Sequence, residues 1–143
     1  MKKWMYYVIQ WTWGLPLNII GAIVWLVLTV CGHKSYWYRN AICTPVKWNF
    51  GGVSMGMFIV RGRMCESIMP HEYGHTIQNM QWGWLAPIVI AIPSACRYWW
   101  REFYMAFIYK RTRKSLPAYD SVWFEWQATE YGKRAKDDAW NWL

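Results

Sequence analysis

SIMPHEYGHTIQNMQW, residues 67–82, is the stretch of this sequence that most constrains the fold. Ser67 is a suitable N-cap, and Pro70 falls in a first helical turn, where backbone N–H groups have no acceptor within the helix. We therefore predict an α-helix over these residues. Because residues i and i+4 share one face of a helix, His71 and His75 are expected to project side by side.

Two histidines at this spacing, with a glutamate after the first, form the pattern His-Glu-x-x-His of zinc hydrolases. Both imidazoles can bind one Zn²⁺ ion, and Glu72 can accept a proton from a water that the metal activates. We predict that His71 and His75 are metal ligands and that Glu72 is the catalytic base. The alternative is a pair of solvated histidines on an amphipathic helix.

A catalytic zinc site usually has three protein ligands, so a third must come from elsewhere in the chain. Glu125 is the favoured candidate, because Ala128, Thr129 and Gly132 follow it at helical spacing and form a stripe that lets another helix approach closely. His33 is the runner-up. The other residues considered as ligands are Glu66, Glu102, Asp120, Glu130, Asp137 and Asp138.

An uncharged run of 29 residues, Trp4 to Gly32, precedes this region. Its apolar part, Leu15 to Val30, is long enough to predict a transmembrane anchor, with a kink expected near Gly14 to Pro16. The chain has 14 Trp and 10 Tyr beside 16 Lys and Arg, a composition that membrane interfaces favour. The net charge of +8 is also typical of nucleic-acid binders, but the long uncharged runs argue against that class.

The predicted fold class is a mainly α membrane protein. It has an N-terminal transmembrane helix, a short β element within 51–60, the helix of the zinc motif, a proline-broken re-entrant or interfacial hairpin, and a C-terminal helix after Ser121. Residues 33–50 are expected to form a basic aromatic loop, and 97–109 an interfacial helix. We expect one membrane-embedded domain over 1–143, with 4–32 as the anchor and 51–143 as the metal-site region. The four cysteines lack metal-ligand spacing and are expected to be reduced.

The three-ligand hypothesis constrains the topology. If the uncharged run 76–96 crossed the bilayer, Glu125 would lie on the opposite side from the two histidines. The segment from Leu85 to Cys96 is only about 18 Å long as a helix, against a hydrocarbon core of about 30 Å, and Pro87 and Pro93 are expected to bend it. We therefore predict a hairpin that turns back, although a full crossing is the rival topology. The basic residues after the anchor favour a cytoplasmic C-terminal side.

His71-Glu72-x-x-His75, followed by a glutamate in Glu125-x-x-Ala128, resembles the gluzincin branch of the zincin metallopeptidases. The resemblance also extends to small membrane zincin-like proteins, and it implies a third zinc ligand at Glu125 and a strand before the motif helix. Many gluzincins have an aspartate four residues after this glutamate to orient a zinc histidine, whereas Thr129 stands there in this chain. The aspartate segment of site-2 membrane peptidases has no counterpart here.

We accordingly predict a zinc-dependent membrane metallopeptidase that acts on peptides or proteins, with membrane lipid as a partner and the site near the cytoplasmic membrane surface. Tyr119, Tyr131 and Arg97 are all candidates to stabilise the transition state. The alternative is a non-catalytic membrane adaptor or toxin-like protein that retains a metal or pseudo-metal site. The sequence indicates neither a specific substrate nor an oligomeric state.

Overall fold

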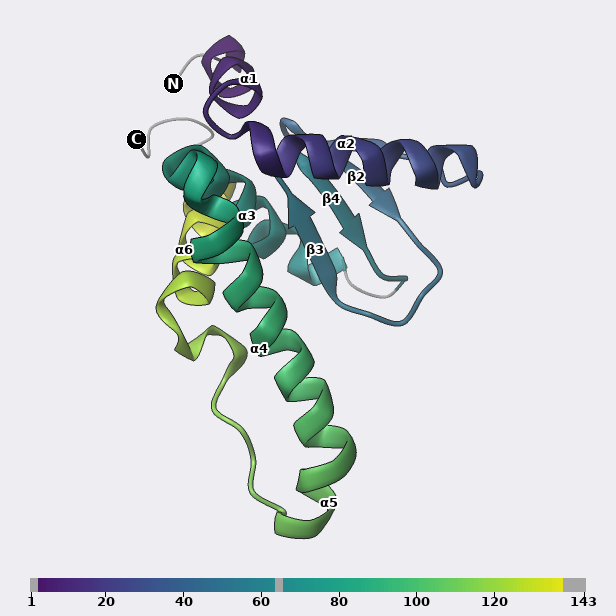
Figure 1. Cartoon of the computed structure of the whole chain (residues 1–143), viewed down its shortest axis with the longest axis vertical. Helices are drawn as coiled ribbons and strands as arrows, with labels where there is room; N and C mark the ends of the chain where they lie inside the picture. Colours follow the sequence, from purple (N-terminus) through teal and green to yellow (C-terminus); the bar gives the residue numbers. More distant parts are fainter. Residues whose placement is uncertain (1–2, 64–65, 138–143) are drawn as a thin grey trace.

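The computed structural model describes residues 3–63 and 66–137, which form a mainly helical α/β structure with a four-stranded mixed sheet (Figure 1). Asp138 and Cys65 lie outside the described residues. The chain begins with two helices and then enters the sheet. These elements are α1 (Lys3–Trp11), α2 (Leu15–Val30), β1 (Tyr36–Tyr38), β2 (Ala41–Pro45), β3 (Gly52–Met55) and β4 (Phe58–Arg61).

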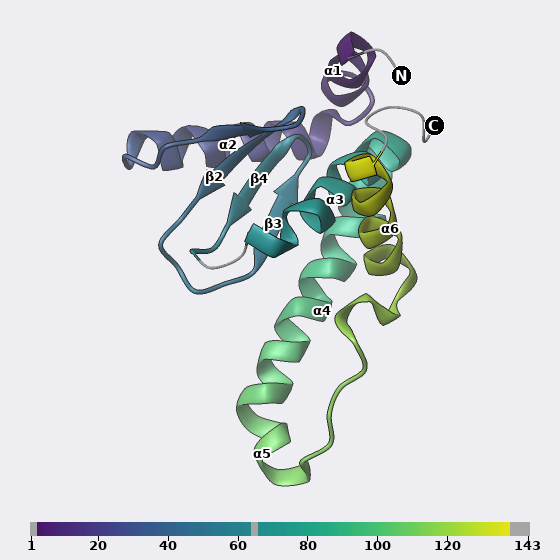
Figure 2. The same cartoon turned by 180° about the vertical axis from the view of Figure 1, so that it is seen from behind.

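The second half of the chain is helical. After a short turn come α3, a long interrupted helix, and α6, which lies beside α3 (Figures 1 and 2). The elements are η1 (Glu66–Ile68), α3 (Met69–Trp82), η2 (Gly83–Leu85), η3 (Pro87–Ala91), α4 (Ile92–Phe103), η4 (Tyr104–Ile108), α5 (Tyr109–Thr112), η5 (Tyr119–Ser121) and α6 (Trp123–Asp137).

The predicted anchor is two helices joined by a sharp corner. The pair α1 and α2 is long and apolar enough to span a membrane, but its axes differ by 92°. Among the described residues, no single helix is both long enough and apolar enough to span a membrane. The core helix of a protein, or a signal sequence, can be as long and apolar as this pair. Buried amides hold the corner, because Asn18 Nδ2 donates to Gln10 O and Gly14 O at 2.7 and 2.9 Å.

The predicted loop at 33–50 is wrong in part, because it contains two strands of the sheet. The strand order is β1-β2-β4-β3, with β2 and β4 parallel and the other pairs antiparallel. β2 was missed because its short run Ala41-Ile42-Cys43-Thr44 becomes a strand through long-range pairing with β4, which periodicity does not reveal. The single strand expected within 51–60 is instead a hairpin, which turns at Gly56 with φ of 64°.

The predicted helix over the zinc motif is confirmed as α3, with Pro70 in its first turn. Ser67 is not its cap, because the N-cap position is Ile68 and no side chain caps the helix. The helix after it is not broken at the prolines, because Pro87 and Pro93 each fall in the first turn of a new helical segment. The chain reverses only at Arg113, whose φ is 51°, and then returns towards α3.

Candidate metal centre

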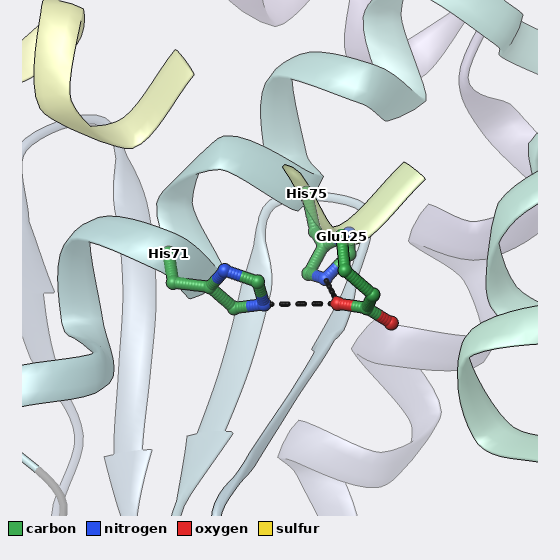
Figure 3. A group of neighbouring side chains, drawn as sticks. All are labelled: His71, His75 and Glu125. Carbon is green, nitrogen blue, oxygen red and sulfur yellow. Dashed lines mark hydrogen bonds and ion pairs between the residues drawn. The ribbon is translucent and has the colours of Figure 1, made fainter. Parts of the chain in front are cut away.

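α3 presents the two histidines on one face, as the spacing predicted. The ring centroids of His71 and His75 are 4.8 Å apart, and the two planes are nearly perpendicular. Both Nε2 atoms point towards the same carboxylate, that of Glu125 on α6 (Figure 3). Two neighbouring turns of α3 and one turn of α6 therefore bring three candidate ligand atoms together.

Glu125 reaches this point because α3 and α6 pack with almost no side-chain volume between them. A Cβ on Gly74 would lie 1.8 Å from Ala128 O, and a Cβ on Gly132 would lie 1.9 Å from Pro70 O. Ala128 is fully buried in the contact. The stripe of small residues predicted to admit another helix does so, and α3 is that helix.

The three side chains lie close enough together to hold one metal ion. Glu125 Oε2 lies 3.1 Å from His71 Nε2 and 3.3 Å from His75 Nε2, and the three ligand atoms lie within 4.8 Å of one another. Ligands at about 2.0–2.2 Å from tetrahedral zinc are separated by about 3.3–3.6 Å. Two imidazoles and one carboxylate are also a known donor set of catalytic zinc.

Burial and the neighbouring charges have opposite effects on the pKa values of Glu125 and His75. Burial raises the pKa of Glu125, but hydrogen bonds from His71 and His75 outweigh it and hold the pKa well below its usual range. Burial alone would lower the pKa of His75, yet the hydrogen bond to Glu125 and the negative charges of Glu72 and Glu125 raise it. The Glu125 carboxylate is therefore ionised, which is the form that binds a cation.

Each ligand is oriented by a second hydrogen bond. Thr129 Oγ1 lies 2.9 Å from His71 Nδ1, and Gln78 Oε1 lies 2.7 Å from His75 Nδ1. Ser94 Oγ donates to Glu125 Oε1 at 2.6 Å. Such partners fix the orientation of the ring that faces a metal.

These partners revise the sequence-based view of the site. Thr129 stands where many gluzincins have an aspartate, and although it has no carboxylate its hydroxyl lies within hydrogen-bond distance of His71. Gln78 was missed, and its position one turn after His75 was the signal that could have found it. Ser94 has no such signal, because only the folded chain brings α4 beside α6.

Glu72 is held next to the metal ligands by the sheet. Ser54 Oγ lies 2.7 Å from Glu72 Oε2 and 2.8 Å from Glu72 O, so one β3 hydroxyl contacts both groups. A Cβ on Gly52 would lie 2.8 Å from Glu72 Oε1, so a glycine there leaves room for the carboxylate. The strand predicted before the motif helix thus positions the candidate base.

Tyr119 is the one candidate transition-state stabiliser that the structure brings to the ligands. Its ring centroid lies 6.2 Å from that of His71, and it lines the same cavity. Burial and the charge of Glu125 raise its pKa to about 12, so the phenol remains protonated at neutral pH. Tyr131 instead donates to Gln81 Oε1.

Arg97 contacts the segment before α6 and not the ligands. Its guanidinium donates to Tyr119 O and Ala118 O, each at 2.8 Å, and it also lies over the Tyr119 ring. Arg101 donates to Pro117 O and lies over the same ring. The two arginines thus hold Tyr119 in place beside the metal centre.

A cavity of about 630 Å³ opens above the ligands, and its lining includes His71, Glu72 and His75. Within residues 3–63 and 66–137, these two histidines and Glu125 are the one group of acidic, histidine or cysteine side chains arranged to hold a metal. His33 is not part of it. Two of the other ligand candidates form ion pairs instead, Glu66 with Arg61 and Glu130 with Lys133.

Comparison with protein-family profiles, curated proteins and solved structures finds no match to this chain. What can be said of its chemistry therefore follows from the geometry of the metal centre.

Proposed function

We propose that this protein is a zinc-dependent membrane metallopeptidase of gluzincin-like type. The observation that carries the proposal is the convergence of His71 Nε2 and His75 Nε2 on Glu125 Oε2, with nitrogen–oxygen separations of 3.1 and 3.3 Å that are close to those around tetrahedral zinc. Glu72 lines the cavity beside these ligands, which is where the motif requires a base.

The chain's own residues have distinct roles in this proposal. His71, His75 and Glu125 would hold the ion, which when bound supplies Lewis acidity for the attack of water on a carbonyl group. Glu72 accepts the proton of the attacking water and then passes it to the leaving amine. Ser54 restricts the Glu72 carboxylate to one orientation through its hydrogen bond.

Tyr119 is suited to stabilise the negative charge that develops on the carbonyl oxygen. Its phenol keeps its proton because its pKa is about 12, so it can donate a hydrogen bond at neutral pH. Arg97 and Arg101 restrict its position through the carbonyl groups around it. We assign Tyr119 this role and give Arg97 and Arg101 positioning roles.

A polypeptide suits the cavity because one of its walls is a strand with a free edge. Within the part of the chain that the structure describes, β3 pairs with β4 on one side only, and all four of its residues line the cavity. An extended peptide can pair with such an edge through main-chain hydrogen bonds. This pairing would hold a peptide bond near Glu72.

A membrane location is supported by the surface of α2. Its exposed large side chains are all aliphatic, whereas a solvent-facing helix carries charges. These residues are Ile19, Ile20, Ile23, Leu26, Val27 and Val30. We propose that this face contacts lipid, with the metal centre near the cytoplasmic surface.

Metal analysis of the full chain purified in detergent tests the proposal. Wild type should hold one zinc per chain, His75→Ala and Glu125→Ala should lose it, and Glu72→Gln should keep zinc but lose peptide hydrolysis. His33→Ala and Glu130→Gln are matched controls outside the centre and should change neither. A wild-type protein without stoichiometric zinc would refute the proposal. Zinc without any hydrolysis would favour the non-catalytic alternative.

A further inference from the structure

The lining of the cavity above the metal centre is unusually poor in charge. Among the described residues, the lining beyond His71, Glu72 and His75 contains no lysine, arginine or aspartate. Most of its walls are aliphatic or aromatic side chains of α2, β3 and the helical segment 86–99. A charged segment of substrate would lose its hydration here without gaining an ionic partner.

The most exposed lining residues mark where the cavity opens, and they are apolar. Ile20 is 48% exposed, Val53 43%, Ile92 57% and Trp99 69%. They come from α2, β3 and α4, so the opening lies between these elements. The rim is therefore hydrophobic, and a large exposed apolar surface marks a contact with a protein or a membrane.

The apolar rim continues into larger uncharged surfaces on both sides. On α2 the exposed aliphatic face extends to Val30. On the other side, every exposed side chain from Trp84 to Trp100 is uncharged, since Arg97 is turned towards the segment before α6. The first exposed charge beyond Trp100 is Glu102. The opening is thus framed by surfaces suited to acyl chains.

We propose that the cavity takes an uncharged, apolar stretch of polypeptide that approaches from the acyl-chain layer, through the opening between α2 and α4. This rests on the proposed peptidase function and adds the class of substrate and its route. A polypeptide leaving lipid needs partners for its backbone N–H and C=O groups once it unwinds for cleavage. The free edge of β3, inside the opening, supplies them.

The route is tested by a lipid-depth measurement that does not depend on activity. In a chain carrying Cys31→Ser and Cys65→Ser, a nitrobenzoxadiazole label is attached to exposed Cys96 beside the opening. The protein is reconstituted into phosphatidylcholine vesicles with spin labels on the acyl chains. We expect strong quenching at this position. The matched control carries the label at Lys133→Cys, with Cys96→Ser, on the exposed side of α6 and should be quenched little.

The substrate class is tested with two peptides of equal length, one with Leu and Val around the central bond and the other with Lys and Glu there. Wild type in vesicles should cleave the apolar peptide at least tenfold faster. Ile20→Glu and Trp99→Glu should lower kcat/KM for it by at least tenfold with zinc content unchanged. Trp48→Glu, a control at an exposed tryptophan outside the lining, should have no effect.

The outcomes separate the two proposals. Equal cleavage of both peptides, or equal quenching at the two labelled positions, overturns the lipid-side route and leaves the peptidase function standing. Cleavage of neither peptide by the zinc-loaded protein overturns both. Hydrolysis of vesicle lipid esters in place of the peptide shows that the occupant is an acyl lipid and overturns the polypeptide assignment.

Discussion

Replacing Gly74 by alanine should push α3 and α6 apart and disable the metal centre. The new Cβ would lie 1.8 Å from Ala128 O, whereas ordinary contact begins at 3.4 Å. The difference, 3.4 minus 1.8, requires a shift of about 1.6 Å between the two backbones, because a carbonyl oxygen within a helix cannot rotate away. Overpacking of this kind typically costs about 1–3 kcal/mol of folding stability.

The effect on metal binding follows from the same shift. Metal–ligand distances tolerate about 0.2 Å, so an ion held by His71 and His75 cannot keep Glu125 after a displacement of about 1.6 Å. We expect zinc affinity to fall at least 100-fold, or about 2.7 kcal/mol. Gly132→Ala should act in the same way, because its Cβ would lie 1.9 Å from Pro70 O.

Competition with a chromophoric chelator measures this affinity, and circular dichroism shows whether the helices remain. Gly51→Ala is the matched control, because the nearest atom to its Cβ, Ile68 Cδ1, lies 4.0 Å away. If Gly74→Ala binds zinc as tightly as wild type, the close approach of α3 and α6 does not position Glu125 and the reasoning is wrong.

Three further outcomes are expected. Thr129→Val removes the hydroxyl beside His71 Nδ1 and should weaken zinc binding about 10–100-fold by chelator competition, whereas Thr129→Ser should keep most of it. Tyr119→Phe should lower kcat with zinc content and KM unchanged; a change in KM alone would argue against a transition-state role. In protein stripped of metal, the raised pKa of His75 stabilises the fold fully at pH values below 6.5, the pKa of an unfolded histidine. The lowered pKa of Glu125 stabilises the fold at pH values above 4.5, the pKa of an unfolded glutamate. The His75 contribution is lost as pH rises through its folded pKa, so the advantage in unfolding free energy of wild type over Glu125→Gln should be larger at about pH 5.5 than at about pH 8.

Much of the candidate ligand group could be predicted from the sequence, because the positions of its members depend largely on local geometry. His71 and His75 share a face in any α-helix, and Glu125 was favoured because small residues follow it at helical spacing. The structure brings all three together. Gln78 was within the same local reach but was not considered, and Ser94 was beyond it because α4 and α6 meet only through tertiary packing.

The same reasoning did less well where a segment's structure depends on distant partners. The uncharged run before Gly32 was predicted as an anchor with a kink near Gly14 to Pro16, and the chain does turn there. The sequence did not show that the turn is a corner of 92° between two helices, held by a buried cluster of Gln10, Asn18 and Asn79 amides. Hydropathy scores each amide by itself and cannot show that the amides bond to one another. β1 and β2 were missed for a related reason, because their hydrogen bonds are made between strands.

Sequence alone thus determined which side chains are available for metal chemistry, since helix periodicity places two histidines and a glutamate on α3 whatever surrounds them. Only the tertiary structure decided that the two histidines meet a third candidate ligand, Glu125, which lies on a different helix. The chain reverses at Arg113 and returns, and the absence of side-chain bulk at Gly74 and Gly132 lets α6 lie close enough for the Glu125 carboxylate to reach both imidazoles. The physical reason is that Glu125 lies 50 residues after His75 in the chain, so its position depends on how closely α3 and α6 pack. That distance is set only when the chain has folded.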